Sequence, residues 1–195
     1  WAGPFGFRTC QSGDVLLTTQ ALINSFGANY PGCTTVTGRL EIGAFSNNLT
    51  FPTIVDVSPL NGITHVTGNF LISRTDNLQQ AHLNNLQQVG GSFEITTAPA
   101  LTSVSFDGIT SVGGNFMFQP GNNLTTVSGM NNLTSIGGNM YFNNLGNPVL
   151  PEFTNLTSIG GNLQILVTSL TSFSGYPALQ SIGGNFILAQ NSALL

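Results

Sequence analysis

A phrase of seven residues recurs along this chain at nearly constant intervals. Its clear copies begin at Val66, Val89, Val112, Ile136, Ile159 and Ile182, and a degenerate copy begins at Val36. The intervals from Val66 onward are 23, 23, 24, 23 and 23 residues, whereas the first, from Val36 to Val66, is 30. We attribute the longer interval to an insertion around residues 46–57. Such regularity is typical of an architecture in which each repeat packs only on its neighbours.

Two spacings of apolar residues occur inside each repeat. Leu163 and Ile165 alternate with polar residues, as in a half-buried strand, whereas Phe153, Leu156 and Ile159 recur at every third position. A period of three fits short extended segments joined by turns, and 23 residues are too few for two helices. The predicted fold class is therefore mainly β, a β-solenoid of about seven coils. We expect strands at 40–42, 70–72, 93–95, 116–118, 140–142, 163–165 and 186–188, with one buried column of Leu40, Phe70, Phe93, Phe116, Met140, Leu163 and Phe186.

A Gly-Gly pair follows the first residue of the phrase in most repeats, and it predicts a corner. There the backbone needs either a positive φ or a close approach to the neighbouring coil. Stacking then places like residues over like. Two rows that could hydrogen-bond along the stack are Asn115, Asn139, Asn162 and Asn185, and Ser111, Ser135, Ser158 and Ser181.

The N-terminal part of the chain lies outside the regular repeat. A short helix is expected there, with Thr18 or Thr19 as its N-cap and Gly27 as its stop. Cys10 and Cys33 flank it, and we predict a disulfide between them; the alternative is two free buried thiols. The domain organisation is therefore an aromatic segment at 1–9, a disulfide-pinned helical cap at 10–35, and solenoid repeats at 36–195.

The segment from Cys33 to Ile42, with the recurring phrase Leu-Thr-Ser-Ile-Gly-Gly-Asn-Leu, resembles the receptor L domain. The resemblance extends over roughly residues 10–195 and includes the L-domain repeats of fungal cell-wall and bacterial surface proteins. It implies a right-handed stack related to leucine-rich repeats, and an extracellular or cell-surface location. The chain departs from a full L domain in lacking a C-terminal cysteine cap, and it shows no signal for a lipid anchor. The fold hosts receptors, wall proteins and adhesins alike, so the resemblance says little about function.

Charged residues make up only 5% of the chain, which has no lysine and a net charge of −4. This composition provides no basic surface for nucleic acid, and no apolar run is long enough to cross a membrane. Among the carboxylates only Glu41 and Glu94 share a column, two coils and roughly 10 Å apart with Leu71 between them. His65 and His82 lack a nucleophile phrase and zinc spacing. We therefore expect no enzyme activity, no metal and no cofactor.

Four Asn-Leu-Thr sequons occur, at Asn48, Asn123, Asn132 and Asn155. They predict covalent glycans if the chain is secreted, and Asn132 and Asn155 occupy the same repeat position. The alternative is that the repeat consensus reuses these residues in its turns.

One column is expected to face outward from the strands, and four of its seven members are large and apolar. It consists of Glu41, Leu71, Glu94, Met117, Tyr141, Gln164 and Ile187. Exposed apolar side chains in a row often mark an interface, although a neighbouring loop could also cover them. The column is the candidate site for an extracellular glycan or peptide.

Copies of the chain itself are the other predicted partner. The seventh coil exposes its apolar interior unless something covers it, and the aromatic N-terminal segment of a second subunit could do so. The residues expected in this contact are Trp1, Phe5, Phe7, Phe186, Leu188, Leu194 and Leu195. Three functions follow: a self-associating structural protein of an extracellular filament or layer, a recognition domain, and, ranked last, an ice-binding solenoid. The alternative to self-association is that the chain is truncated and that the missing residues form a C-terminal cap.

Overall fold

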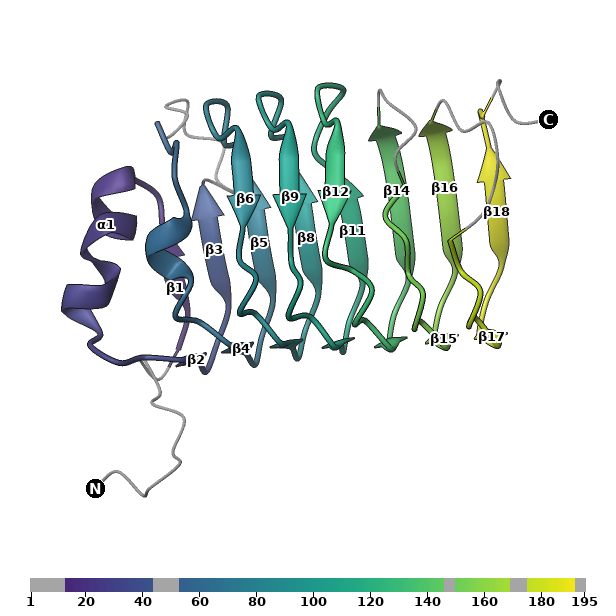
Figure 1. Ribbon diagram of the computed structural model, residues 1–195, viewed down its shortest axis with the longest axis horizontal. Coiled ribbons are helices and arrows are strands. Elements are labelled where there is room, and N and C mark those ends of the chain that lie inside the picture. Colours follow the sequence, from purple (N-terminus) through teal and green to yellow (C-terminus); the bar gives the residue numbers. More distant parts are fainter. Residues whose placement is uncertain (1–12, 44–52, 146–149, 169–174, 192–195) are drawn as a thin grey trace, which may run out of the picture.

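The structure is a computed structural model that describes residues 13–43, 53–145, 150–168 and 175–191. It is a β-solenoid of about seven turns, about 23 residues apart, with one α-helix at its first end (Figure 1). The predicted fold class is therefore confirmed. Three parallel sheets run along the stack, one for each side of the coil.

The largest sheet has eight parallel strands and carries the second half of the recurring phrase. Its members in order are β1 (Val15–Leu17), β3 (Leu40–Gly43), β5 (Phe70–Ser73), β8 (Phe93–Thr96), β11 (Phe116–Gln119), β14 (Met140–Leu145), β16 (Leu163–Thr168) and β18 (Phe186–Ala189). All seven expected strands are present. Equivalent residues of successive repeats pair directly, as Phe93, Phe116 and Met140 do, so the predicted register is confirmed.

The second sheet has seven two-residue strands just before the Gly-Gly corners. They are β2 (Thr35–Val36), β4 (His65–Val66), β7 (Gln88–Val89), β10 (Ser111–Val112), β13 (Ser135–Ile136), β15 (Ser158–Ile159) and β17 (Ser181–Ile182). The third sheet contains β6 (Gln80–His82), β9 (Ser103–Ser105) and β12 (Thr126–Ser128), and a 3₁₀-helix, η1, spans Ser58–Leu60.

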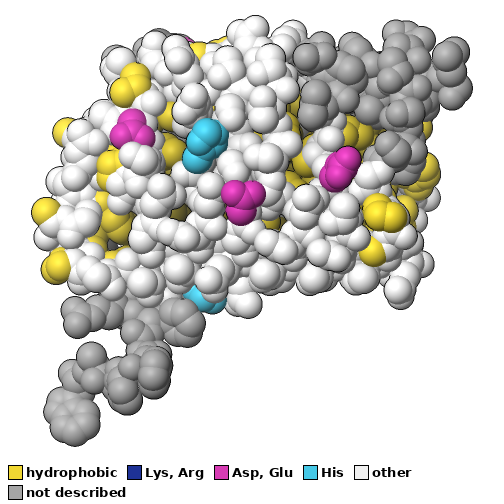
Figure 2. Space-filling model, in the orientation of Figure 1, with side chains coloured by type: hydrophobic (Ala, Val, Ile, Leu, Met, Phe, Trp, Pro, Cys, Tyr) yellow, Lys and Arg dark blue, Asp and Glu magenta, His cyan; other side chains and the backbone are white. Residues whose placement is uncertain are grey.

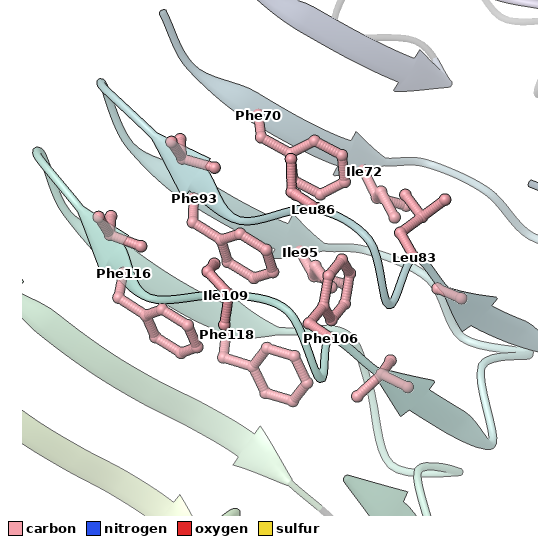
Figure 3. Close-up of a cluster of buried hydrophobic side chains, with 14 of the residues drawn as sticks. Phe70, Ile72, Leu83, Leu86, Phe93, Ile95, Phe106, Ile109, Phe116 and Phe118 are labelled. Carbon is pink, nitrogen blue, oxygen red and sulfur yellow. The ribbon is translucent and has the colours of Figure 1, made fainter. Parts of the chain in front are cut away.

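The core is a continuous file of apolar side chains inside the coils. Phe70, Phe93 and Phe116 stack with ring centroids 5.2 and 5.0 Å apart, and Phe106 packs edge-on against Phe93 at 4.9 Å (Figure 3). Six members of the predicted column are completely buried. Phe186, the seventh, is 49% exposed, because it lies on β18, the last strand of the sheet among the described residues. The expectation that all seven are buried is wrong at this one position.

The Gly-Gly corners exist because neighbouring coils approach closely there. A Cβ placed on Gly113 would overlap the carbonyl oxygen of Gly90 one coil earlier, and one on Gly114 would lie 2.8 Å from the backbone of Gly91. Neither glycine of this pair has a φ in the left-handed region. Of the two reasons expected for glycine, close approach is therefore the one that applies.

The asparagine row forms the predicted hydrogen-bonded ladder. Asn115 Oδ1 accepts the backbone N–H of Asn139 at 2.8 Å, and Asn139 Oδ1 accepts that of Asn162 at 2.8 Å. Asn162 Oδ1 accepts the N–H of Asn185 at 2.7 Å. The serine row is aligned as expected, but threonines carry the hydrogen bonds beside it. Thr134 and its equivalents, for example, donate Oγ1–H to a backbone carbonyl of the preceding coil.

The N-terminal cap contains a strand that the sequence did not predict. β1 pairs with β3, and Asp14 Oδ1 accepts the backbone N–H of Arg39 at 2.9 Å, as an asparagine does in later coils. Helix α1 (Gln20–Asn29) follows, with Thr19 Oγ1 capping the N–H of Leu22. Gly27 does not stop this helix, which continues for two residues to Asn29.

Long-range hydrogen bonds hold α1 against the stack. Gln20 Oε1 accepts the backbone N–H groups of Val55 and Asp56 at 2.9 and 3.0 Å, and its Nε2 donates to the carbonyl of Asp56 at 2.9 Å. Most of the expected insertion lies outside the described residues. Its C-terminal end, which includes Val55 and Asp56, anchors the cap through these hydrogen bonds. Ile23 and Phe26 form the buried face of the helix.

Candidate functional site

The outward column of the eight-stranded sheet is only partly open. Glu41 and Leu71 are 3% and 5% exposed, whereas Ile187 on β18 is 37% exposed. Of the two alternatives for this column, an exposed face and a covered one, its first two members fit the covered one. Between them and Ile187 lie half-buried side chains on four neighbouring strands: Glu94, Met117, Tyr141 and Gln164. We call these four residues the strand-face row.

Glu41 belongs to a structural ion-pair cluster at the cap. Its Oε2 lies 3.2 Å from Arg39 Nη1, and Arg39 Nη2 lies 3.5 Å from Asp14 Oδ2. The cluster links β1 to β3, because Asp14 directly precedes β1. Glu41 shares its column with Glu94 across Leu71, as expected, but its carboxylate is already paired.

Glu94 lies in a different environment. Its strand neighbours in the column are Leu71 and Met117, both apolar, and burial raises the pKa of its carboxyl above the usual range. A carboxylate in such surroundings is poorly solvated, so a ligand that donates hydrogen bonds or carries a positive charge would relieve it.

Tyr141 and Asn143 lie next to each other on the same face. Asn143 Nδ2 donates to Tyr141 Oη at 2.9 Å, which fixes the direction of the phenol. Asn143 Oδ1 is buried and has no hydrogen-bond partner among the described residues. A ligand on this face would thus find an oriented hydroxyl.

A groove of about 600 Å³ follows the seven-stranded sheet along the stack. Its lining consists of the Val or Ile of each short strand and the residues just before and after it, chiefly Ser and Gly. The lining includes His65, Thr67, Gln88, Gly90, Ser111, Gly113, Ser135, Gly137, Ser158, Gly160, Ser181 and Gly183. The sequence analysis missed this groove, although the phrase Ser-Ile-Gly-Gly carries its signal: small residues on both sides of an inward one.

The three sequons within the described residues follow from the repeat itself. Asn155 Nδ2 donates to the carbonyl of Asn131 at 2.7 Å, Leu156 is buried, and Thr157 Oγ1 donates to the carbonyl of Thr134 at 3.0 Å. Asn123 and Asn132 make the same kind of bond, to the carbonyls of Pro99 and Asp107. Each residue of Asn-Leu-Thr thus has a structural role, and glycosylation stays a prediction. Asn48 lies outside the described residues.

The two histidines form hydrogen bonds that the sequence did not indicate. His82 Nε2 lies 2.8 Å from Ser103 Oγ in the third sheet, and His65 Nδ1 lies 2.8 Å from Thr64 Oγ1. The Ser103–His82 pair connects two neighbouring coils. Among the described residues no group of three or more His, Cys, Asp or Glu is arranged to hold a metal ion.

The residues expected in self-association are only partly described. Trp1, Phe5, Phe7, Leu194 and Leu195 lie outside the described residues, as does Cys10, so the end-to-end contact and the disulfide stay predictions. Cys33 is buried, Phe186 is exposed, and Leu188 is half-buried. No helix in the described parts is both long and apolar enough to span a bilayer.

Charged side chains are sparse on the surface. The face in Figure 2 shows a few scattered acidic groups and two histidines among uncharged polar side chains.

Comparison with known proteins agrees with this geometry. Residues 32–102 match the family model of the receptor L domain. Over these residues the chain is similar to a receptor L domain. The match runs from just before β2 to just before β9, little more than a third of the chain, and the coils beyond it repeat the same geometry. No curated protein and no solved structure matches the chain.

The receptor L domain is a non-enzymatic ligand-binding domain that is typically extracellular.

Proposed function

We propose that this protein is an extracellular recognition module that binds an extended peptide on its eight-stranded sheet. The observation that carries the proposal is the strand-face row, four half-buried side chains in register on parallel strands. Parallel strands about 4.8 Å apart set these side chains on a nearly regular line.

The chemistry of the row favours a peptide over a sugar. Met117 and the ring of Tyr141 offer apolar contact, and Glu94 offers a desolvated carboxylate beside them. A peptide with an apolar side chain close to a Lys or Arg would satisfy both. Pairing a cation with a carboxylate that is already desolvated costs less than desolvating a solvated one.

Selection from a random peptide library on the immobilised protein tests this proposal. We expect enriched peptides with a basic residue near an apolar one, and their binding should fall at least 10-fold in Tyr141→Ala and in Glu94→Gln. Thr126→Ala, an exposed position on β12 in another sheet, is the matched control and should bind normally. The proposal fails if no sequence is enriched, or if binding survives both strand-face variants.

End-to-end self-association is the second candidate function. The supporting observation is the apolar surface at β18, the last strand of the sheet among the described residues, where Phe186 and Ile187 are 49% and 37% exposed. Sedimentation of the whole chain should show assemblies that grow with concentration. Deleting residues 1–7 or introducing Phe186→Ser should each reduce them. A full-length monomer at high concentration would contradict this function.

A further inference from the structure

The groove on the seven-stranded sheet is a second surface with its own chemistry, on a different side of the coil from the strand-face row. It crosses six strands, from His65 on β4 to Ser181 on β17. Since neighbouring strands lie about 4.8 Å apart, its length is about 24 Å. A volume of about 600 Å³ over that length leaves room for one extended chain in single file, not for a globular partner.

The groove is uncharged. Among the described residues no Asp, Glu, Lys or Arg lines it, and His65 at one end is the one ionisable side chain. An anionic or cationic polymer would therefore lose solvation on entering and gain no countercharge. The ligand that fits is neutral.

Serine hydroxyls recur once per coil on the four strands from β10 to β17, whereas the equivalent positions on β4 and β7 are His65 and Gln88. Ser111, Ser135 and Ser158 pair in register, and within the described chain their hydroxyls make no hydrogen bond, in contrast to the adjacent threonines. A ligand that offers hydrogen-bond donors and acceptors can therefore bond to the serine hydroxyls.

The depth of the groove depends on the corner glycines. The residues after the inward Val or Ile are Gly90, Gly113, Gly137, Gly160 and Gly183, and the carbonyl of the preceding coil leaves no room for a Cβ at any of them. The floor is therefore backbone, and it is fixed by the same close approach that holds the coils together.

These features distinguish between the two extended ligands considered for this chain. An extended peptide carries one N–H and one C=O every 3.3 Å, which is about three backbone polar groups for each coil that it crosses. The groove offers one serine hydroxyl per coil as a partner for them. The strands cannot supply the rest, because their own backbone groups bond to the neighbouring coils. Sugar hydroxyls both donate and accept, as serine hydroxyls do, so a glycan matches the row.

We propose that this groove binds a single chain of an uncharged, unbranched glycan, lying along the solenoid axis with its hydroxyls bonded to the serine row. The inference is independent of the peptide site, which uses another sheet.

Calorimetric titration with defined hexasaccharides tests the groove. The probes are hexamers of β-1,4-linked glucose, mannose and xylose and of β-1,3-linked glucose, with a galacturonate hexamer as the charged comparison. We expect at least one neutral hexamer to bind and the charged one to bind at least 10-fold more weakly. Ser135→Phe, which fills the groove, should abolish binding. The double variant Ser135→Ala/Ser158→Ala should weaken it by about 30-fold, since two neutral hydrogen bonds are lost.

Two controls keep the result specific. Thr126→Phe adds the same ring outside the groove and should leave binding unchanged, and unfolding curves should show that each variant is folded. Tyr141→Ala separates this site from the peptide site, because it should not affect the glycan. The inference is overturned if no neutral hexamer binds at millimolar concentration, if the charged one binds equally well, or if Ser135→Phe binds normally. Loss of binding in Tyr141→Ala alone would move the glycan to the strand face.

Discussion

Phe116→Ala and Phe186→Ala remove the same side chain from the same repeat position in two environments. Phe116 is fully buried, and its ring lies 5.0 Å from Phe93 and 5.8 Å from both Phe142 and Phe153. Phe186 lies on the last strand of the sheet among the described residues and is 49% exposed. The pair therefore isolates the contribution of stacking between coils from that of local conformation.

The magnitudes follow from burial and ring contacts. Truncating a buried Phe to Ala costs about 3–5 kcal/mol, and the several aromatic contacts of Phe116 place it at the upper end of that range. At Phe186 roughly half the apolar area is lost and no enclosed cavity forms, so we expect about 1 kcal/mol. The predicted difference in the free energy of unfolding is thus about 3–4 kcal/mol.

Urea denaturation followed by circular dichroism measures this difference, with the slope of each transition checked for loss of cooperativity. Solenoid stability is approximately a sum of contributions from coils and their interfaces. Phe116→Ala disturbs two interfaces in the middle of the stack, whereas Phe186→Ala disturbs one. Equal destabilisation by the two variants would refute the reasoning, because it would mean that packing against a second coil adds nothing to the free energy of unfolding.

Three further predictions concern the corner, the strand face and the cap. Gly113→Ala should destabilise the fold by about 1–3 kcal/mol in the same urea assay, since the added methyl overlaps the Gly90 carbonyl. The control is Gly27→Ala, where a Cβ meets nothing within 4 Å and the change should be neutral or stabilising. Glu94→Gln should raise the melting temperature at pH 7. The reason is that the pKa of the Glu94 carboxyl is raised above 4.5 in the folded protein, so the protein loses stability as the pH rises through that pKa. The gain in melting temperature should vanish below about pH 4, where the carboxyl is protonated in both the folded and the unfolded state. The predicted Cys10–Cys33 disulfide should stabilise the fold by about 3 kcal/mol, measured as the change in the free energy of unfolding on reduction. Two alkylatable thiols in native, unreduced protein would contradict it.

The sequence by itself determined the period, the strand positions and the inward column. A repeat of 23 residues forces equivalent residues to stack, so one strand assignment fixes all the others, and the alternation at Leu163 and Ile165 then decides which side chains point inward. It also predicted the asparagine ladder, because an amide stacked on its equivalent can reach the next coil's N–H.

Only the tertiary structure decided features that depend on contacts between unlike segments. β1 carries no full copy of the phrase, and it became a strand because β3 offered an edge for Val15 to pair with. The helix ran past Gly27 because Ile23 and Phe26 pack on the stack and Gln20 bonds to the end of the insertion, which outweighs the low helix propensity of one glycine. Burial of Glu41 and the depth of the serine groove are likewise properties of the assembled coils. Exposure depends on what neighbouring chain segments cover, and a local pattern of residues does not contain that information.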